Sequence, residues 1–241
     1  MDHFEGQSMT LDEKATALSR TALFGTIAPS EQRLLAHHAI VRRLVRGDIL
    51  FVVEEEAEGM FVIVSGSVRA FRVSSDGREQ VIHVEHAGAT LAEVPVFDGG
   101  AYPATASAEE ESVVLFIDKR DFREFLLTHP QVALAALKLL AGRLRSHAEL
   151  VESLSLREVG QRLAQLFISE ARDRGSMGDG RIEVILPLSH QQLAARVGSV
   201  REVVTRALTR LQKDGLVFIH GHRLVIPDHD RLAAYAENSS S

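Results

Sequence analysis

The stretch that decides the fold lies near the C-terminus and reads Leu188-Ser-His-Gln-Gln-Leu-Ala-Ala-Arg-Val-Gly198-Ser-Val-Arg-Glu-Val-Val-Thr-Arg-Ala-Leu-Thr-Arg-Leu211. Ser189 with Gln192, and Ser199 with Glu202, have the spacing of capping boxes, in which side chains bond the free N–H groups of a helix start. We therefore expect two helices joined by a tight glycine turn. This spacing is typical of a helix-turn-helix.

The second helix of this pair has one apolar stripe, formed by Val200, Val203, Val204, Ala207, Leu208 and Leu211. Arg201, Glu202, Thr205 and Arg206 then face outward together near its N-terminal end. An arginine can bond guanine O6 and N7 together, and a carboxylate can accept from cytosine N4. This face predicts the reading of a G·C-containing DNA step. A solvated face with Glu202 paired to Arg206 explains the charges, but not the capped helix before them.

The surroundings of this element also favour DNA. Residues 216–220 and 223–226 predict a hairpin, or wing, whose turn carries His222 and Arg223. The net charge is −6, but from Arg157 onward Lys and Arg outnumber Asp and Glu. The basic residues between positions 189 and 223 are Arg196, Arg201, Arg206, Arg210, Lys213 and Arg223. A basic module behind an acidic one is expected when only one end meets phosphates.

Upstream, a long helix is predicted from Gln131 to about Leu154. Its apolar positions step by threes and fours, with His147 in one slot of the series: Ala133, Leu137, Leu140, Leu144, Val151 and Leu154. This seam favours a parallel homodimer over a helix packed only on its own domain. A second apolar face, Leu134, Ala141 and Ala148, is expected to contact its own domain. Ser155 and Glu158 have capping-box spacing, which predicts a hinge and a new helix over 156–174.

The N-terminal half predicts a β-rich domain after two short helices at 11–24 and 30–40. Candidate strands are Ile49–Val53, Met60–Ser65, Ser67–Val73, Gln80–Val84 and Val113–Ile117. Many short strands at this spacing indicate a sandwich or jelly roll. Asp118 opens a helix that Pro130 ends, a further strand is expected at 182–186, and the tail 238–241 is expected to be disordered. The fold class is α+β.

Composition excludes several classes of chemistry. The chain has no cysteine, which removes disulfides, thiolate zinc sites and cysteine-ligated iron–sulfur clusters. No apolar run approaches the roughly 18 residues of a membrane helix, and the N-terminus has no signal-peptide core. We expect a cytoplasmic chain with no membrane partner.

The order of β-roll, long helix, hinge, helix-turn-helix and wing resembles the CRP/FNR superfamily of transcription regulators, over about Phe24 to Ile226. The most specific pieces are the recognition element Val197–Arg206 and the cassette Gly88–Gly100. The resemblance implies a β-roll effector-sensing domain at 1–129, a dimerisation helix and hinge at 130–155, and a winged helix-turn-helix DNA-binding domain at 156–241. It implies double-stranded DNA, a second copy, a small-molecule effector and RNA polymerase as partners.

Residue by residue, the resemblance implies palindromes with TGTGA-like half-sites, because Arg201, Glu202 and Arg206 match the family's Arg-Glu-x-x-x-Arg pattern. The DNA-binding set it implies is completed by Thr205 and by residues near phosphates: Ser189, His190, Gln191 and Ser199. The protein is then a sequence-specific transcription regulator and not an enzyme.

The sensor departs from the family's cyclic-nucleotide pattern. Gly-Glu has become Ala92-Glu93, and the Arg-Ser pair falls on Tyr102-Pro103. A cyclic phosphate needs a cation, and no Arg lies between Arg78 and Arg120. The effector is therefore expected not to be cyclic AMP. The candidate effector residues are Ala92, Glu93, Tyr102, Ala104, Thr105 and His147, the last expected at the dimer seam as a sensing contact or a structural polar residue.

Three alternatives stay open on the residues. A haem gas sensor of the same fold would use His147 or another of the 11 histidines as axial ligand. A cupin-like metal enzyme would use His83, His86 and Glu93, although alternation along a strand puts the two histidines on opposite faces. A dimeric scaffold without DNA binding conflicts with the basic recognition face.

Overall fold

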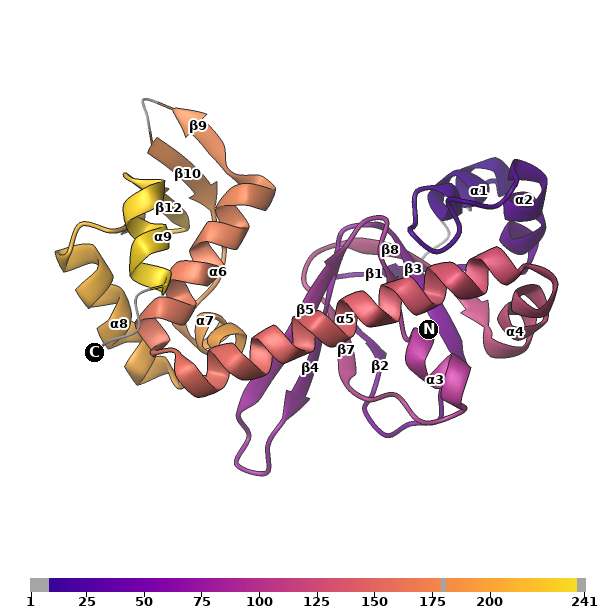
Figure 1. Cartoon of the computed structure of the whole chain (residues 1–241), viewed down its shortest axis with the longest axis horizontal. Coiled ribbons are helices and arrows are strands. Elements are labelled where there is room, and N and C mark those ends of the chain that lie inside the picture. Colours follow the sequence, from indigo (N-terminus) through magenta and orange to yellow (C-terminus); the bar gives the residue numbers. More distant parts are fainter. Residues whose placement is uncertain (1–8, 179–180, 238–241) are drawn as a thin grey trace. The chain divides into compact units, whose positions relative to one another are not determined.

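The computed structural model describes residues 9–178 and 181–237. The chain divides into two compact units. The first contains residues up to Arg72 together with Ile82–Ser146, and the second contains Val73–Val81 together with residues from His147 onward. The elements of both are labelled in Figure 1.

The first unit is built on two sheets. In chain order its elements are α1 (Leu11–Ser19), α2 (Pro29–His38), β1 (Ile40–Leu44), β2 (Ile49–Phe51), β3 (Gly59–Ser65), β4 (Ser67–Val73), β5 (Glu79–His86), β6 (Thr90–Leu91), α3 (Glu93–Asp98), β7 (Thr105–Ala108), β8 (Ser112–Asp118) and α4 (Lys119–Thr128), followed by α5 (Pro130–Leu156). Within the described residues the sheet orders are β1-β8-β3-β6 and β2-β7-β4-β5. The pairs β1–β8, β3–β8 and β4–β7 are antiparallel.

Alternation along β3 explains how these sheets bury two cores. Phe61 and Ile63 belong to one apolar cluster, together with Phe116 of β8. Met60 and Val62 point the other way and belong to a second cluster, which also contains buried residues of α1, α2, α4 and α5. Because successive side chains of a strand point to opposite faces, a strand covered on both sides reads as a continuous apolar run.

The long helix α5 begins at Pro130, one residue after the C-cap of α4. The expectation for its inward face is wrong: Leu134, Ala141 and Ala148 are exposed, and the residues buried on α5 are Val132 and Ala136. Both belong to the cluster beneath the helices of the first unit. A helix has several apolar stripes when Leu and Ala are frequent, so composition alone does not choose the packed one.

The second unit contains α6 (Val159–Arg174), β9 (Ser176–Gly178), β10 (Arg181–Ile185), α7 (His190–Val197), α8 (Arg201–Lys213), β11 (Phe218–His220), β12 (Arg223–Ile226) and α9 (His229–Glu237). Its strands form a sheet in the order β11-β12-β10-β9. Phe167 of α6 is fully buried in the apolar core, with Val204, Leu208 and Leu211 of α8. This unit therefore holds the two predicted helices and the predicted hairpin in one domain.

The hinge cap expected at Ser155 is wrong. Ser155 lies within α5, and the helix that follows begins at Val159 with Glu158 as its N-cap. The Glu158 amide donates to Gln161 Oε1 at 2.9 Å, which completes the cap. The cap bond thus comes from the glutamine at the third helical position, while the Glu158 side chain makes no cap hydrogen bond.

The α+β class is confirmed, and the five predicted N-terminal strands lie where they were expected, within two residues at each end. Strands β1, β6, β7 and β9 and helices α3 and α9 were not predicted. The expected tail at 238–241 lies outside the described residues. No single helix among the described residues is long and apolar enough to cross a bilayer, although the pair α4 and α5, bent by 114°, meets the criteria of length and composition together.

Candidate nucleic-acid interface and effector site

Helix α7 begins as the sequence predicts. Ser189 is its N-cap: its hydroxyl accepts a hydrogen bond from Gln192 N at 3.2 Å, and its own amide donates to Gln192 Oε1 at 2.9 Å. At the other end Gly198 has φ +63°, a left-handed conformation that glycine adopts without a steric cost. The first capping box and the glycine turn are therefore confirmed.

The second capping box is wrong. The N-cap of α8 is Val200, which has no side-chain cap, and Ser199 precedes it. The amide of Ser199 donates to Ala194 O at 2.9 Å, so this residue closes the C-terminal turn of α7. The Val200 carbonyl accepts from the amides of Val203 and Val204. In so short a turn one serine cannot finish one helix and cap the next.

Helix α8 separates an apolar face from a polar one. Val204, Leu208 and Leu211 are buried, whereas the four predicted base-reading residues are all exposed: Arg201, Glu202, Thr205 and Arg206. All four lie within the first six residues of the helix. A recognition helix touches base edges with this part, and a buried stripe on the opposite side fixes its rotation.

Two of the predicted residues from different helices contact each other. His190 Nδ1 lies 2.9 Å from Thr205 Oγ1, and the Thr205 hydroxyl is 2.9 Å from Arg201 O, to which it donates. Since a hydroxyl has one hydrogen, Thr205 accepts from the imidazole N–H. Ser189, His190 and Gln191 are exposed at the start of α7. The first turns of the two helices are thus joined by polar contacts.

Arg196 does not belong to the exposed basic face. Its guanidinium lies 3.6 Å from Glu170 of α6, and both side chains are about one-tenth exposed. From the sequence, Arg196 was expected among the basic residues of the DNA-binding module, and its partner Glu170 was not predicted. A buried carboxylate on the preceding helix is the signal that separates a structural arginine from a surface one.

The wing is a hairpin of β11 and β12, in which His220 pairs with Arg223. Its turn contains Gly221 with φ +62°, a backbone that favours glycine. Arg223 is more than half exposed and lies 3.2 Å from Glu183 of β10. The hairpin expected from the sequence is therefore confirmed.

In the first unit the predicted effector residues centre on Glu93, the first residue of α3, which is fully buried. Ala92 before it has φ +65°, the left-handed conformation in which the family pattern has glycine. The backbone turn therefore survives the substitution at a steric cost. Glu93 Oε1 is buried without a hydrogen-bond partner in the described structure.

The cation that faces Glu93 comes from α5 and was missed by the sequence analysis. Arg143 Nη1 donates to Glu93 Oε2 at 2.5 Å, and Arg143 Nη2 donates to Thr90 O at 2.5 Å and to Glu85 Oε1 at 3.3 Å. Burial raises the pKa of Glu85, and the charge of Arg143 opposes that rise. Arg143 follows the buried Ala136 by seven residues, so helical periodicity places it on the same face.

Tyr102, Ala104 and Thr105 are already engaged within the domain. Tyr102 is buried, stacks on Phe51 with ring centroids 4.1 Å apart, and its phenolic oxygen accepts from Glu58 N at 3.3 Å. Burial raises the pKa of Tyr102. Ala104 is buried, and Thr105 Oγ1 accepts from Val53 N at 3.1 Å. The aromatic ring fills space where the family pattern has a cation and a hydroxyl.

His147 is exposed on α5 in the single chain. Its expected burial at a seam involves a second copy and stays a prediction. Among the described residues no group of three or more His, Asp or Glu side chains could hold a metal ion.

Comparison with known proteins places this geometry in a family. Residues 41–129 match the model of the cyclic nucleotide-binding domain, and residues 161–235 match that of the Crp-like helix-turn-helix domain. The CRP-like cAMP-activated global transcriptional regulator of Mycobacterium tuberculosis is 27% identical over 219 residues, 91% of this chain and 98% of that protein. The chain belongs to the CRP/FNR superfamily.

Further relatives of this CRP/FNR regulator agree. The cyclic AMP receptor protein of Thermus thermophilus is 29% identical over 195 residues, covering 81% of this chain and 87% of that protein. The structure of FixK2 from Bradyrhizobium japonicum has the same fold, with a TM-score of 0.71 at 22% identity over 84% of this chain and 99% of that chain. The CRP/FNR regulator thus carries a β-sheet domain of the cyclic nucleotide-binding type and a DNA-binding helix-turn-helix.

Proposed function

We propose that this CRP/FNR regulator acts in the cytoplasm as a homodimer that reads a pseudo-palindrome with TGTGA-like half-sites. The observation that carries the proposal is the polar face of α8, where Arg201, Glu202 and Arg206 are exposed opposite the buried Val204 and Leu208. Two arginines can each bond a guanine with two hydrogen bonds, and the carboxylate between them can accept from a cytosine amine. Together they specify G·C pairs within one half-site.

The start of α7 is proposed to hold the DNA backbone. Ser189, His190 and Gln191 are exposed there, where the free N–H groups and positive dipole end of a helix attract phosphate. Ser199 precedes α8 and is proposed as a further polar contact. The His190–Thr205 hydrogen bond supports these two roles, phosphate contact by α7 and base contact by α8, because it joins the first turns of the two helices.

Dimerisation through α5 is supported by an apolar stripe with a seven-residue repeat. Leu137, Leu144 and Val151 are 63%, 72% and 63% exposed, which leaves them in water in a single chain. A parallel copy of the same helix would cover them as in a coiled coil. Dyad-related recognition helices then bind half-sites whose centres lie one helical turn of DNA apart, or about 34 Å.

We further propose that the effector is a small molecule other than cyclic AMP. The buried cluster near Glu93 has two carboxylates, Glu85 and Glu93, around one guanidinium, that of Arg143. The formal net charge of these three side chains is −1, which disfavours the binding of an anionic ligand beside them. Tyr102 supplies a stacked ring and an engaged hydroxyl where a cyclic phosphate needs charge-assisted donors. The effector then stabilises one dimer arrangement over another. That arrangement in turn determines how the DNA-bound dimer contacts RNA polymerase.

The experiment is a selection of binding sites from randomised duplexes, with and without cell extract. We expect a two-fold symmetric consensus containing G·C pairs, and we expect extract to change the enrichment. Recovery of no consensus under either condition contradicts the function. Calorimetry with cyclic AMP tests the effector proposal separately, and micromolar binding contradicts it. A Soret band in the purified protein would replace the proposal with the haem-sensing alternative.

A further inference from the structure

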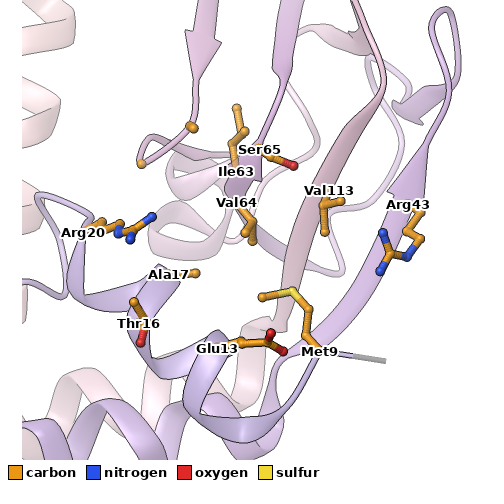
Figure 2. Close-up of a pocket in the computed structure, with 12 residues that line it drawn as sticks. Met9, Glu13, Thr16, Ala17, Arg20, Arg43, Ile63, Val64, Ser65 and Val113 are labelled. Atoms are coloured by element: carbon orange, nitrogen blue, oxygen red, sulfur yellow. The ribbon is translucent and has the colours of Figure 1, made fainter. Parts of the chain in front are cut away.

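Ionisable side chains from two helices of the first unit line a cavity of about 250 Å³ between α2 and α4. They are His38 of α2, Asp121 and Glu124 of α4, and His129 at the end of α4. A larger cavity beside α1, of about 530 Å³, is shown in Figure 2, and none of the described residues that line it is a histidine. The smaller cavity therefore marks a group of titratable side chains outside the DNA-binding and effector sites.

His129 is buried at the C-cap of α4, with an oxygen beside each nitrogen of its ring. Nδ1 lies 2.8 Å from Phe125 O, and Nε2 lies 3.2 Å from Glu31 Oε1 of α2. A carbonyl and a carboxylate have no hydrogen to donate, so each nitrogen that faces one of them needs a proton of its own. The ring also stacks on Phe125, with centroids 3.9 Å apart. With both contacts in place, the imidazole carries two protons and a positive charge.

The hydroxyl of Thr128 does not remove this requirement. Its Oγ1 lies 2.8 Å from His129 Nδ1 and 3.1 Å from Phe125 O. If Thr128 donates to Nδ1, a neutral ring can keep its proton on Nε2, but the Phe125 carbonyl then faces the lone pair of Nδ1. If the neutral ring keeps its proton on Nδ1, the lone pair of Nε2 faces the Glu31 carboxylate. Each neutral form therefore places a lone pair against an oxygen, and the cation places none.

A second histidine–carboxylate contact joins the same two helices in the opposite direction. His38 Nδ1 of α2 lies 3.2 Å from Asp121 Oδ2 of α4, and these side chains are 50% and 35% exposed. Glu31, the acid of the first contact, is held by the N-terminal cap of α2, because its Oε2 accepts from Ala28 N at 3.0 Å. Since water screens an exposed pair, the contact of the buried His129 contributes more than that of His38.

We propose that the His129–Glu31 and His38–Asp121 contacts form a proton-dependent clasp, which holds α2 against α4 and the start of α5. The His129 carbonyl accepts from Val132 N at 2.9 Å in the first turn of α5, so the clasp lies at the corner between the two helices. Glu124 is the further carboxylate that lines the cavity. Histidine changes charge between roughly pH 5 and 8, where carboxylates are ionised. Because the protonated histidines pair with the carboxylates, the contribution of the clasp to stability is present at the lower end of this range and is lost as pH rises.

The test is amide hydrogen exchange of the full-length protein, compared at about pH 6 and about pH 8 after correction for the intrinsic exchange rates. Exchange reports the local opening of a helix from the domain beneath it. The amides of α2 are expected to be at least about threefold more protected at the lower pH, as the loss of a modest ion pair requires. Equal protection of α2 at the two pH values overturns the proposal.

Matched variants assign the effect to the clasp. His129→Gln and Glu31→Gln each remove one charge of the buried contact and are expected to abolish most of the pH dependence of α2 protection. The amide oxygen in Glu31→Gln can still accept from Ala28 N, so this variant keeps the cap of α2. His37→Gln is the control, because His37 is exposed beside His38 and does not line the cavity. Circular dichroism confirms that each variant is folded. An unchanged pH dependence in folded Glu31→Gln, or its loss in His37→Gln, contradicts the assignment.

Discussion

The contact between Arg143 and Glu93 gives the sharpest prediction about the first unit. Glu93 is fully buried, and Arg143 is 18% exposed at its side chain. Removing one partner of a buried pair leaves the other charge uncompensated, at a cost of about 3 to 5 kcal/mol. Since Arg143 is partly exposed, we expect Arg143→Met to lower the free energy of unfolding by about 3 kcal/mol, at the lower end of that range. Arg145→Met, an exposed change on the same helix, is the matched control.

A double-mutant cycle shows whether the cost comes from the stranded carboxylate. Glu93→Gln removes the charge but leaves Arg143 bonded to Thr90 O and Glu85, so its cost is about 1 to 2 kcal/mol. In the Arg143→Met background the same substitution removes an unpaired buried charge and is expected to recover about 2 kcal/mol. If the double variant loses as much unfolding free energy as the two single variants together, the pairing of Arg143 with Glu93 is contradicted.

The pH dependence has a defined sign. Burial raises the pKa of Glu85 in the folded state above 4.5, and Arg143 opposes that rise. A carboxyl with a raised folded pKa contributes its full stability below its unfolded pKa and loses it as pH rises through the folded pKa. Arg143→Met raises the Glu85 pKa further. The difference in unfolding free energy between the parent and this variant is therefore expected to become smaller as pH falls from 7 toward 4.5. Urea unfolding followed by far-ultraviolet circular dichroism, at one protomer concentration, measures this. A loss of unfolding free energy that does not change with pH, or that equals the loss in Arg145→Met, refutes the reasoning.

Three further predictions concern other elements. Ala92→Gly removes the steric cost of a left-handed alanine and is expected to raise the unfolding free energy by about 0.5 kcal/mol. The control Ala89→Gly, outside the left-handed region, is expected to lower it by a similar amount. Equal effects of the two substitutions contradict backbone strain at Ala92. Glu170→Gln weakens the buried pair with Arg196 and is expected to destabilise the second unit by about 2 kcal/mol, with faster amide exchange in α7; unchanged exchange contradicts this. Leu144→Glu is expected to give monomers at micromolar concentration in sedimentation experiments, and a persistent dimer excludes the α5 seam.

The parts of the fold that the sequence predicts well have strong local signals. Strand β4, Ser67–Val73, matches its expected bounds, because β-branched residues end in a cluster of turn residues. The Ser189 cap and the glycine turn are likewise local. Strand β1 was missed because two arginines interrupt its apolar pattern: Arg42 lies over the Phe116 ring, while Arg43 lies on the next position.

The parts that escaped prediction depend on contacts distant in sequence. Arg143 is fifty residues from Glu93, and nothing beside it in the chain identifies its partner. Glu170 and Arg196 pair across two helices, so an arginine that the sequence places among the exposed basic residues is only about one-tenth exposed at its side chain. The inward face of α5 was misassigned because the choice among its apolar stripes is made by the shape of the domain beneath it. The base-reading assignment of α8 stays a prediction.

The most direct test of that assignment compares two arginines on one helix. Arg206 lies on the proposed base-reading face, and Arg210, one turn later, is also exposed and lies 3.9 Å from Asp214. Equilibrium binding of Arg206→Ala to the selected palindrome is expected to lose about 1 to 3 kcal/mol per contact and to relax preference at one G·C pair in each half-site. Binding to random duplexes should change little, and Arg210→Ala should leave the consensus intact. Equal losses on selected and random DNA, or the same relaxed consensus from Arg210→Ala, contradict the proposed reading of DNA by this face.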